Sequence, residues 1–158
     1  MEIRRSVLVS HRAEQMFDLI EAAEHYPAFL PWCADARIVA RDDTEVVADI
    51  LVAWHGVRFG FTTRNPKRRP EWMAVTLERG PFRHFAGEWQ LAPLGEVGCR
   101  VNFTLTYDFE SGVMRTVASP VFERITSTLV DAFVARADRV YVPPAMPGPD
   151  AGPPRSLT

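Results

Sequence analysis

Apolar side chains recur every three or four residues between Val113 and Tyr141, a pattern that predicts one amphipathic helix. Pro120 falls inside the pattern, so we expect the helix to kink or to start afresh there. From Val121 to Tyr141 the helix would be about 30 Å long, at ~1.5 Å per residue. The predicted buried stripe, which Arg136 interrupts, comprises Met114, Val117, Val121, Ile125, Leu129, Ala132, Phe133 and Val140.

A helix of this length constrains what the rest of the chain can form. A sheet of about six or seven strands, spaced ~4.8 Å apart, is as wide as the helix is long. One helix can therefore lie across one whole curved sheet. On the pattern alone, an ordinary core helix is an equal alternative.

The segments before this helix predict the sheet. Residues 2–10 favour a first strand, and two short helices follow, one opening at His11 and one near Pro27. Between residues 36 and 109 we expect six strands joined by short turns, and residues 101–109 alternate most strongly. Strands joined in this way are antiparallel. The expected fold class is α+β, with the sheet curved around the long C-terminal helix.

Composition narrows the classes of protein. The 158 residues fit one domain over residues 1–142, followed by a Pro- and Gly-rich tail, 143–158, that we expect to be disordered. A net charge of −2 argues against a general attraction to nucleic acid, and we expect no DNA partner. Two isolated cysteines predict neither a disulfide framework nor a metal cluster. With no apolar run typical of a signal peptide or a membrane span, we expect a cytoplasmic protein.

A sheet wrapped around one helix predicts an apolar cavity between them, which suits a hydrophobic small molecule. The two broken helical segments, around Pro27 and Pro120, would form its mouth. The alternative is that these side chains simply fill a core, as aromatic stripes usually do. The predicted cavity residues are Tyr26, Phe29, Trp32, Phe59, Phe61, Phe85, Trp89, Phe103, Tyr107, Val121, Ile125, Leu129 and Phe133.

Several separate motifs, in register from residue 2 to residue 141, resemble one known family. They are Tyr26–Cys33, Phe61–Asn65, Gly80–Arg83, Gly87–Trp89 with Leu91 and Pro93–Leu94, Cys99–Val101, Val121–Phe122 and Ala132–Ala137. The resemblance is to the coenzyme Q-binding START family, in the polyketide cyclase/START-like superfamily, which includes bacterial ribosome-association toxins. It implies the helix-grip fold, in agreement with the order of elements above.

The resemblance implies two activities of different kinds. One is a non-catalytic carrier or chaperone that holds a ubiquinone-like polyprenyl quinone in the cavity and supports respiration; this is the function we expect from the sequence. The alternative is a toxin that binds the large ribosomal subunit and blocks subunit joining. We expect no covalent cofactor, and a quinone-type lipid as the bound ligand.

A cationic segment bears on the alternative. Arg64, Lys67, Arg68 and Arg69 lie close together in a predicted loop, with Arg58 nearby. These side chains would suit rRNA phosphates, or anionic head groups at the inner surface of the cytoplasmic membrane. A solvated hairpin turn is the simpler interpretation.

Catalysis is a third alternative, because related helix-grip proteins include polyketide cyclases. The titratable candidates are scattered, and no Ser-His-Asp order or phosphate-binding loop is present. His84 is the best single candidate, at a predicted strand end. We therefore expect the protein not to be an enzyme.

Overall fold

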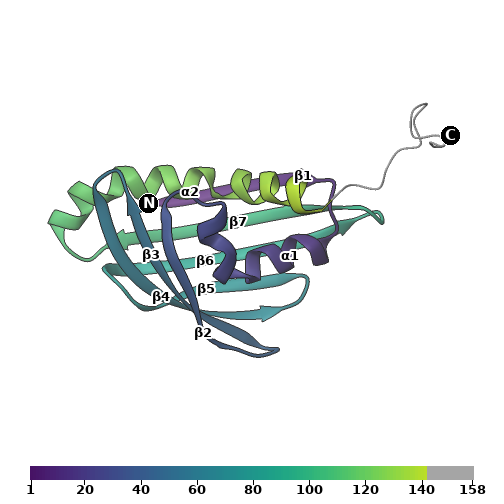
Figure 1. Ribbon diagram of the computed structural model, residues 1–158, viewed down its shortest axis with the longest axis horizontal. Coiled ribbons are helices and arrows are strands. Elements are labelled where there is room, and N and C mark those ends of the chain that lie inside the picture. Colours follow the sequence, from purple (N-terminus) through teal and green to yellow (C-terminus); the bar gives the residue numbers. More distant parts are fainter. Residues whose placement is uncertain (142–158) are drawn as a thin grey trace.

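The computed structural model describes residues 1–141 and contains one seven-stranded antiparallel sheet with helices on one side (Figure 1). The strands lie in the order β1-β7-β6-β5-β4-β3-β2. The predicted α+β helix-grip arrangement is confirmed. The predicted tail, residues 143–158, lies outside the described residues. The elements are β1 (Glu2–Val9), α1 (Ala13–Glu21), the 3₁₀ helix η1 (Ala23–Ala28), β2 (Cys33–Arg41), β3 (Glu45–Trp54), β4 (Val57–Arg68), β5 (Trp72–Arg79), β6 (Phe82–Leu94), β7 (Gly98–Phe109) and α2 (Gly112–Val140).

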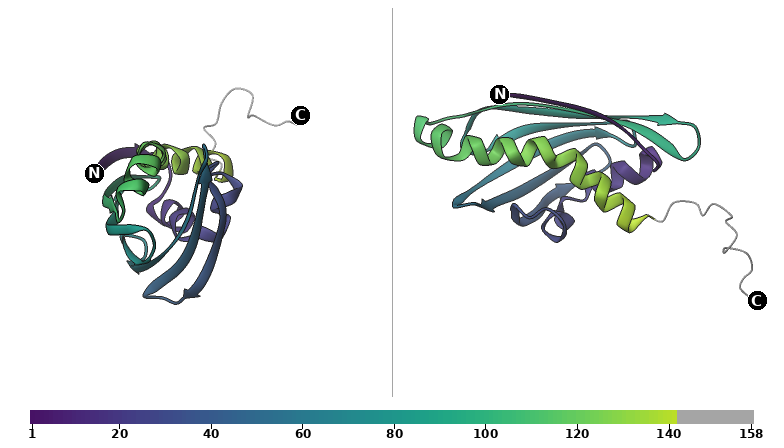
Figure 2. Two further views of the ribbon diagram at one scale, coloured as in Figure 1. Left: turned by 90° about the vertical axis from the view of Figure 1, so that its left-hand side faces the viewer. Right: turned by 90° about the horizontal axis from the view of Figure 1, so that it is seen from above.

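The sheet curls into a trough, and α2 lies over its open side (Figure 2). The helices α1 and η1 lie on the same side of the sheet as α2, where Tyr26 of η1 packs against Phe133 of α2. Strand alternation drives this arrangement, because alternate residues of β7 from Cys99 to Phe109 are buried while those between them are partly exposed or exposed. The apolar face of the sheet therefore turns inward and needs the helices to cover it.

The long helix is one element, and Pro120 does not divide it. Ser111 caps its start, because the Ser111 side chain accepts a hydrogen bond from the backbone N–H of Met114 at 3.1 Å. Pro120 is exposed, so the backbone carbonyl that it leaves without an intrahelical partner lies toward the solvent side. The expected second start at this proline is thus wrong.

The buried stripe of α2 differs from the predicted one. Val117 and Val140 are 54% and 46% exposed, so both were placed wrongly. The stripe includes three small side chains, Ala118, Thr126 and Ala137, which let the helix approach the sheet closely. Thr126 fits there because its hydroxyl donates to the carbonyl of Phe122, at 3.0 Å. The buried residues are Ala118, Phe122, Ile125, Thr126, Val130, Phe133 and Ala137.

Phe122 anchors α2 to the sheet. Its ring lies 4.8–6.4 Å, between centroids, from six other aromatic rings. All six pairs are tilted or edge-on, arrangements that aromatic rings favour. The partners, which with Phe122 we call the aromatic cluster, are Phe59, Phe61, Phe82, Phe85, Tyr107 and Phe109.

Candidate functional site

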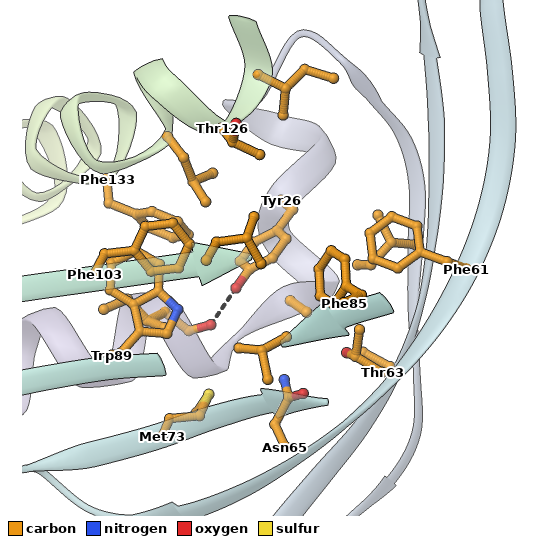
Figure 3. A pocket seen from close by; sticks show the side chains of 18 of the residues that line it. Tyr26, Phe61, Thr63, Asn65, Met73, Phe85, Trp89, Phe103, Thr126 and Phe133 are labelled. Carbon is orange, nitrogen blue, oxygen red and sulfur yellow. Dashed lines mark hydrogen bonds between the residues drawn. The ribbon is translucent and has the colours of Figure 1, made fainter. Parts of the chain in front are cut away.

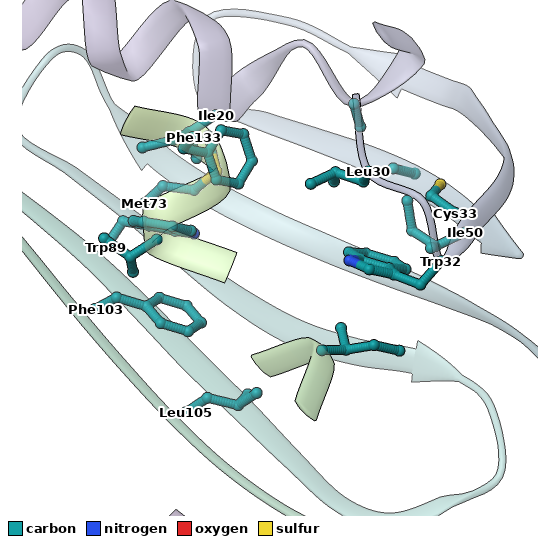
Figure 4. Close-up of a cluster of buried hydrophobic side chains, with 14 of the residues drawn as sticks. Ile20, Leu30, Trp32, Cys33, Ile50, Met73, Trp89, Phe103, Leu105 and Phe133 are labelled. Carbon is teal, nitrogen blue, oxygen red and sulfur yellow. The ribbon is translucent and has the colours of Figure 1, made fainter. Parts of the chain in front are cut away.

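A cavity of about 100 Å³ lies between α2, the short helices and the inner face of strands β3–β7 (Figure 3). Its walls are mainly apolar, and buried hydrophobic side chains surround it (Figure 4). For comparison, an apolar protein cavity of roughly 150 Å³ holds one benzene molecule. This cavity is smaller than that, so even a single ring would require its walls to shift slightly outward. A complete polyprenyl tail would require α2 or η1 to move outward.

Most of the residues that we predicted from the sequence do line this cavity. The strands contribute aromatic rings from one side and α2 contributes aliphatic and aromatic side chains from the other. The lining residues among those predicted are Tyr26, Trp32, Phe61, Phe85, Trp89, Phe103, Ile125, Leu129 and Phe133.

The other predicted residues lie elsewhere, and these assignments were wrong. Phe59 and Tyr107 belong to the aromatic cluster, where other rings rather than open space surround them. Phe29 packs edge-on against the ring of Phe133, with centroids 5.4 Å apart, and so stands behind the wall. Val121 is only partly buried, because its neighbour Phe122 takes the inward position on α2.

Sequence reasoning missed part of the wall. Every second residue of β3 from Val46 to Ile50 lines the cavity, a period-two signal that was present in the sequence. The same period of two places Thr63 and Asn65 on the inner face of β4, after Phe61. The further lining residues are Ile20, Glu21, Ala23, Val46, Ala48, Ile50, Thr63, Asn65, Met73, Val75, Leu105, Phe122 and Thr126.

Polar groups gather where β4 meets the end of α1. The Glu21 carboxylate lines the cavity and forms an ion pair with the ammonium group of Lys67. The side chains of this pair are only 16% and 7% exposed. Thr63 and Asn65 line the same region from β4. The cavity thus has an apolar body and one polar end.

Two tyrosines, the partly buried Tyr26 that lines the cavity and the buried Tyr107 near it, both stay neutral at physiological pH. Burial raises the pKa of Tyr26 above its ordinary value, and its hydroxyl donates to the backbone carbonyl of Ile20. Burial also raises the pKa of Tyr107 to about 12, an effect that the nearby Thr126 hydroxyl opposes. The Tyr107 hydroxyl nevertheless lacks a hydrogen-bond partner of regular geometry in the described part of the chain. Neither phenol is therefore prepared to act as a base.

The predicted cationic loop is wrong in two respects. First, β4 continues to Arg68, because the Lys67 N–H donates to the Thr44 carbonyl at 2.9 Å. Second, carboxylates neutralise most of its charges: Lys67 pairs with Glu21, and Arg69 pairs with Asp18 at 2.8 Å.

The remaining cations of this predicted group differ from one another. Arg64 pairs with Glu78 at 3.0 Å and also with Glu45. Arg68 is exposed and lies over the Trp72 ring, 5.4 Å from its centroid. Arg58 is also exposed. The side chains that can meet a phosphate are thus Arg58 and Arg68 rather than the whole group.

The histidines stand away from the cavity, since none of them is among the residues that line it. The His84 ring is exposed and shares a 2.7 Å hydrogen bond with the Thr106 hydroxyl. His11 is buried and forms a 2.7 Å contact with the Asp138 carboxylate, which joins the start of α1 to the end of α2. No cluster of metal-ligating side chains occurs within residues 1–141. Over the same residues, no helix is long and apolar enough to cross a bilayer.

Comparisons with known proteins extend these observations. A ribosome association toxin, RatA of Pseudomonas aeruginosa, is 34% identical over 88% of this chain and 96% of its own length. A coenzyme Q-binding protein, COQ10 homolog B of Xenopus laevis, is 25% identical over 89% of this chain and 59% of its own. Among solved structures, the Zhui aromatase/cyclase from Streptomyces sp. R1128 superposes with a TM-score of 0.76 at 18% identity, covering 88% of this chain and 94% of its own.

The family model described as "Polyketide cyclase / dehydrase and lipid transport" matches residues 9–134, from the end of β1 to well into α2. That range includes every residue that lines the cavity. The chain belongs to this START-like family.

Proposed function

We propose that this protein associates with the ribosome in the cytoplasm, binding the large subunit and limiting its joining to the small one. The observation that carries the proposal is the 34% identity to a ribosome association toxin along 96% of that relative's length. A shared fold does not by itself require this level of sequence identity, since the aromatase/cyclase has the same fold at 18% identity. This supports the ribosomal role ahead of the lipid carrier that we expected from the sequence.

The outer face of the sheet supplies a candidate contact surface. Arg58 and Arg68 project from β4 on the face away from α2, at even positions of the strand. Arg79 of β5 lies on the same face, because its guanidinium reaches the Thr62 hydroxyl at 3.4 Å. Arg79 is 75% exposed, and its nearest carboxylate contact is Asp49 at 4.0 Å. We call Arg58, Arg68 and Arg79 the outer arginines; their exposed guanidinium groups suit rRNA phosphates.

Co-sedimentation with purified large subunits tests this proposal. We expect the protein to pellet with the subunits at low salt and less at moderate salt, because phosphate contacts release counterions. The double variant Arg58→Glu/Arg68→Glu should pellet several-fold less. A matched control is Arg100→Glu on β7, three strands away from β4, which also reverses the charge of an exposed arginine. If the unaltered protein fails to pellet at either salt concentration, the ribosomal role is excluded.

We propose hydrophobic-ligand binding as a second candidate function, favoured by the apolar cavity and by the name of the Xenopus relative. A quinone-type lipid is the expected ligand, and the remote position of the histidines supports binding without chemistry. Mass spectrometry of gently extracted protein should detect a bound lipid. Leu129→Arg, which puts a charge into the cavity wall, should remove that lipid, whereas Val117→Arg on the exposed side of α2 should not. Protein that carries no lipid, and that an added quinone does not stabilise, would refute this function.

A further inference from the structure

The inner face of β4 changes character along its length. Its alternate residues Phe59, Phe61, Thr63, Asn65 and Lys67 run from aromatic to polar to charged. Phe61, Thr63 and Asn65 all line the cavity, so the change occurs within the cavity itself. A ligand there meets rings at one end and hydrogen-bonding groups at the other.

Asn65 has an unused hydrogen-bonding group at this polar end. Its Oδ1 atom is buried and has no hydrogen-bond partner in the described part of the chain. The side chain points into the cavity beside Thr63, with Met73 on the neighbouring strand β5 (Figure 3). A primary amide offers one acceptor and two donors, and leaving a buried one unpaired costs free energy. A ligand hydroxyl, which donates its O–H to Oδ1, would supply the missing partner.

The charges nearby restrict which oxygen can bind. The Glu21 carboxylate lines the same cavity, and its charge is already balanced by the buried ammonium group of Lys67. Arg41, which lies 3.6 Å from the same carboxylate, is itself paired with Glu24 at 2.8 Å. These cations are committed to carboxylates, so an anionic head group would be desolvated beside Glu21 with no cation to receive it.

We propose that Asn65 forms the polar subsite of the cavity and selects a neutral ring that carries a hydroxyl group. The rings of Phe61 and Phe85, which lie side by side in the cavity wall, supply an aromatic surface against which a planar ring can pack. Fatty acids and other anionic lipids are excluded by the paired charges. This inference deepens the second candidate function, on which it rests, and is independent of the ribosomal role.

Two probe molecules of similar shape, one neutral and one negatively charged, test the inference. At pH 7, 4-propylphenol is neutral because phenols titrate near pKa ~10, whereas 4-propylbenzoate is ionised because carboxyl groups titrate near ~4. Titrations followed by NMR should show the phenol shifting the side-chain amide resonances of Asn65. The benzoate should bind at least tenfold more weakly.

Variants then locate the subsite. Asn65→Leu should weaken binding of the phenol about three- to tenfold, the worth of one hydrogen bond. The same variant without ligand should unfold at a higher temperature, because an unpaired polar group has been replaced by an apolar one. Asn102→Leu on β7, a residue that does not line the cavity, is the matched control.

Three outcomes would overturn the inference. They are equal binding of the two probes, unchanged phenol binding in Asn65→Leu, and no binding of either probe. If Asn65→Leu does not fold, the NMR titration of the unaltered protein decides. The inference is then refuted unless the phenol shifts the Asn65 side-chain amide resonances and the benzoate does not. None of these results affects co-sedimentation with ribosomal subunits, so the two proposals fail separately.

Discussion

Replacing Phe122 by alanine tests how α2 is held on the sheet. Phe122 is 3% exposed and contacts the rings of the aromatic cluster, so its truncation leaves a hole between helix and sheet. Buried Phe-to-Ala changes cost about 3–5 kcal/mol. The number of aromatic partners puts Phe122 toward the top of that range, at about 4–5 kcal/mol of unfolding free energy. For a domain of this size, each kcal/mol lowers the midpoint of thermal unfolding by about 2–4 °C.

The assay is urea unfolding followed by tryptophan fluorescence, with the slope of free energy against urea compared between variants. The matched control is Val121→Ala, the neighbouring position, which the structure places on the partly exposed flank of α2. It should cost only about 1 kcal/mol, since little of its apolar surface is fully buried. If Val121→Ala destabilises as much as Phe122→Ala, the helix is rotated relative to this description and the reasoning about its inner face is refuted.

Three further predictions concern ionisable groups. Lys67→Met should lower the free energy of unfolding by about 2 kcal/mol, because it leaves the Glu21 carboxylate without its ammonium partner. The double variant with Glu21→Gln should recover most of that loss in urea unfolding. Additive losses in unfolding free energy would refute a coupled pair. Burial raises the pKa of both cysteine thiols to about 11, so they should react slowly with a disulfide reagent at pH 8 until urea is added, and equally fast reaction of folded protein would contradict their burial. The hydrogen bond from Thr62 holds the pKa of the Asp49 carboxyl below its ordinary value. The ionised carboxylate therefore stabilises the fold above about pH 4, and this stabilisation is lost as the pH falls through the lowered pKa. Asp49→Asn should reduce the loss of unfolding free energy at acid pH, and an unchanged loss would refute the assignment.

The sequence predicted the elements well because their signals are local. Alternation along residues 101–109 and the three-and-four spacing after Val113 each report a buried face within a single element. The orientation of α2 was harder to predict. Ala118 and Ala137 are buried because the sheet lies close to the helix, whereas the larger Val117 is exposed. That choice depends on the distance between helix and sheet, which no single segment encodes.

The site was predicted in part for the same reason. The rings of β4, β6 and β7 that line the cavity were predicted from the alternation within each strand, but the period of β4 was not followed beyond Phe61 to Asn65. The cationic loop was misjudged because the carboxylates that neutralise it come from α1, β3 and β5 rather than from adjacent residues. Pairs such as Arg69 with Asp18 join residues far apart in the chain, and no spacing in the sequence predicts them.

We propose that this protein acts on ribosomal subunits, and an assay of subunit joining tests that proposal. Purified small and large subunits can be mixed at a magnesium concentration that joins them, with increasing amounts of the protein, and separated on a sucrose gradient. We expect joined ribosomes to decrease, free subunits to increase, and the protein to migrate with the large subunit. A gradient that stays unchanged when the protein is in excess, with the protein at the top, would contradict it.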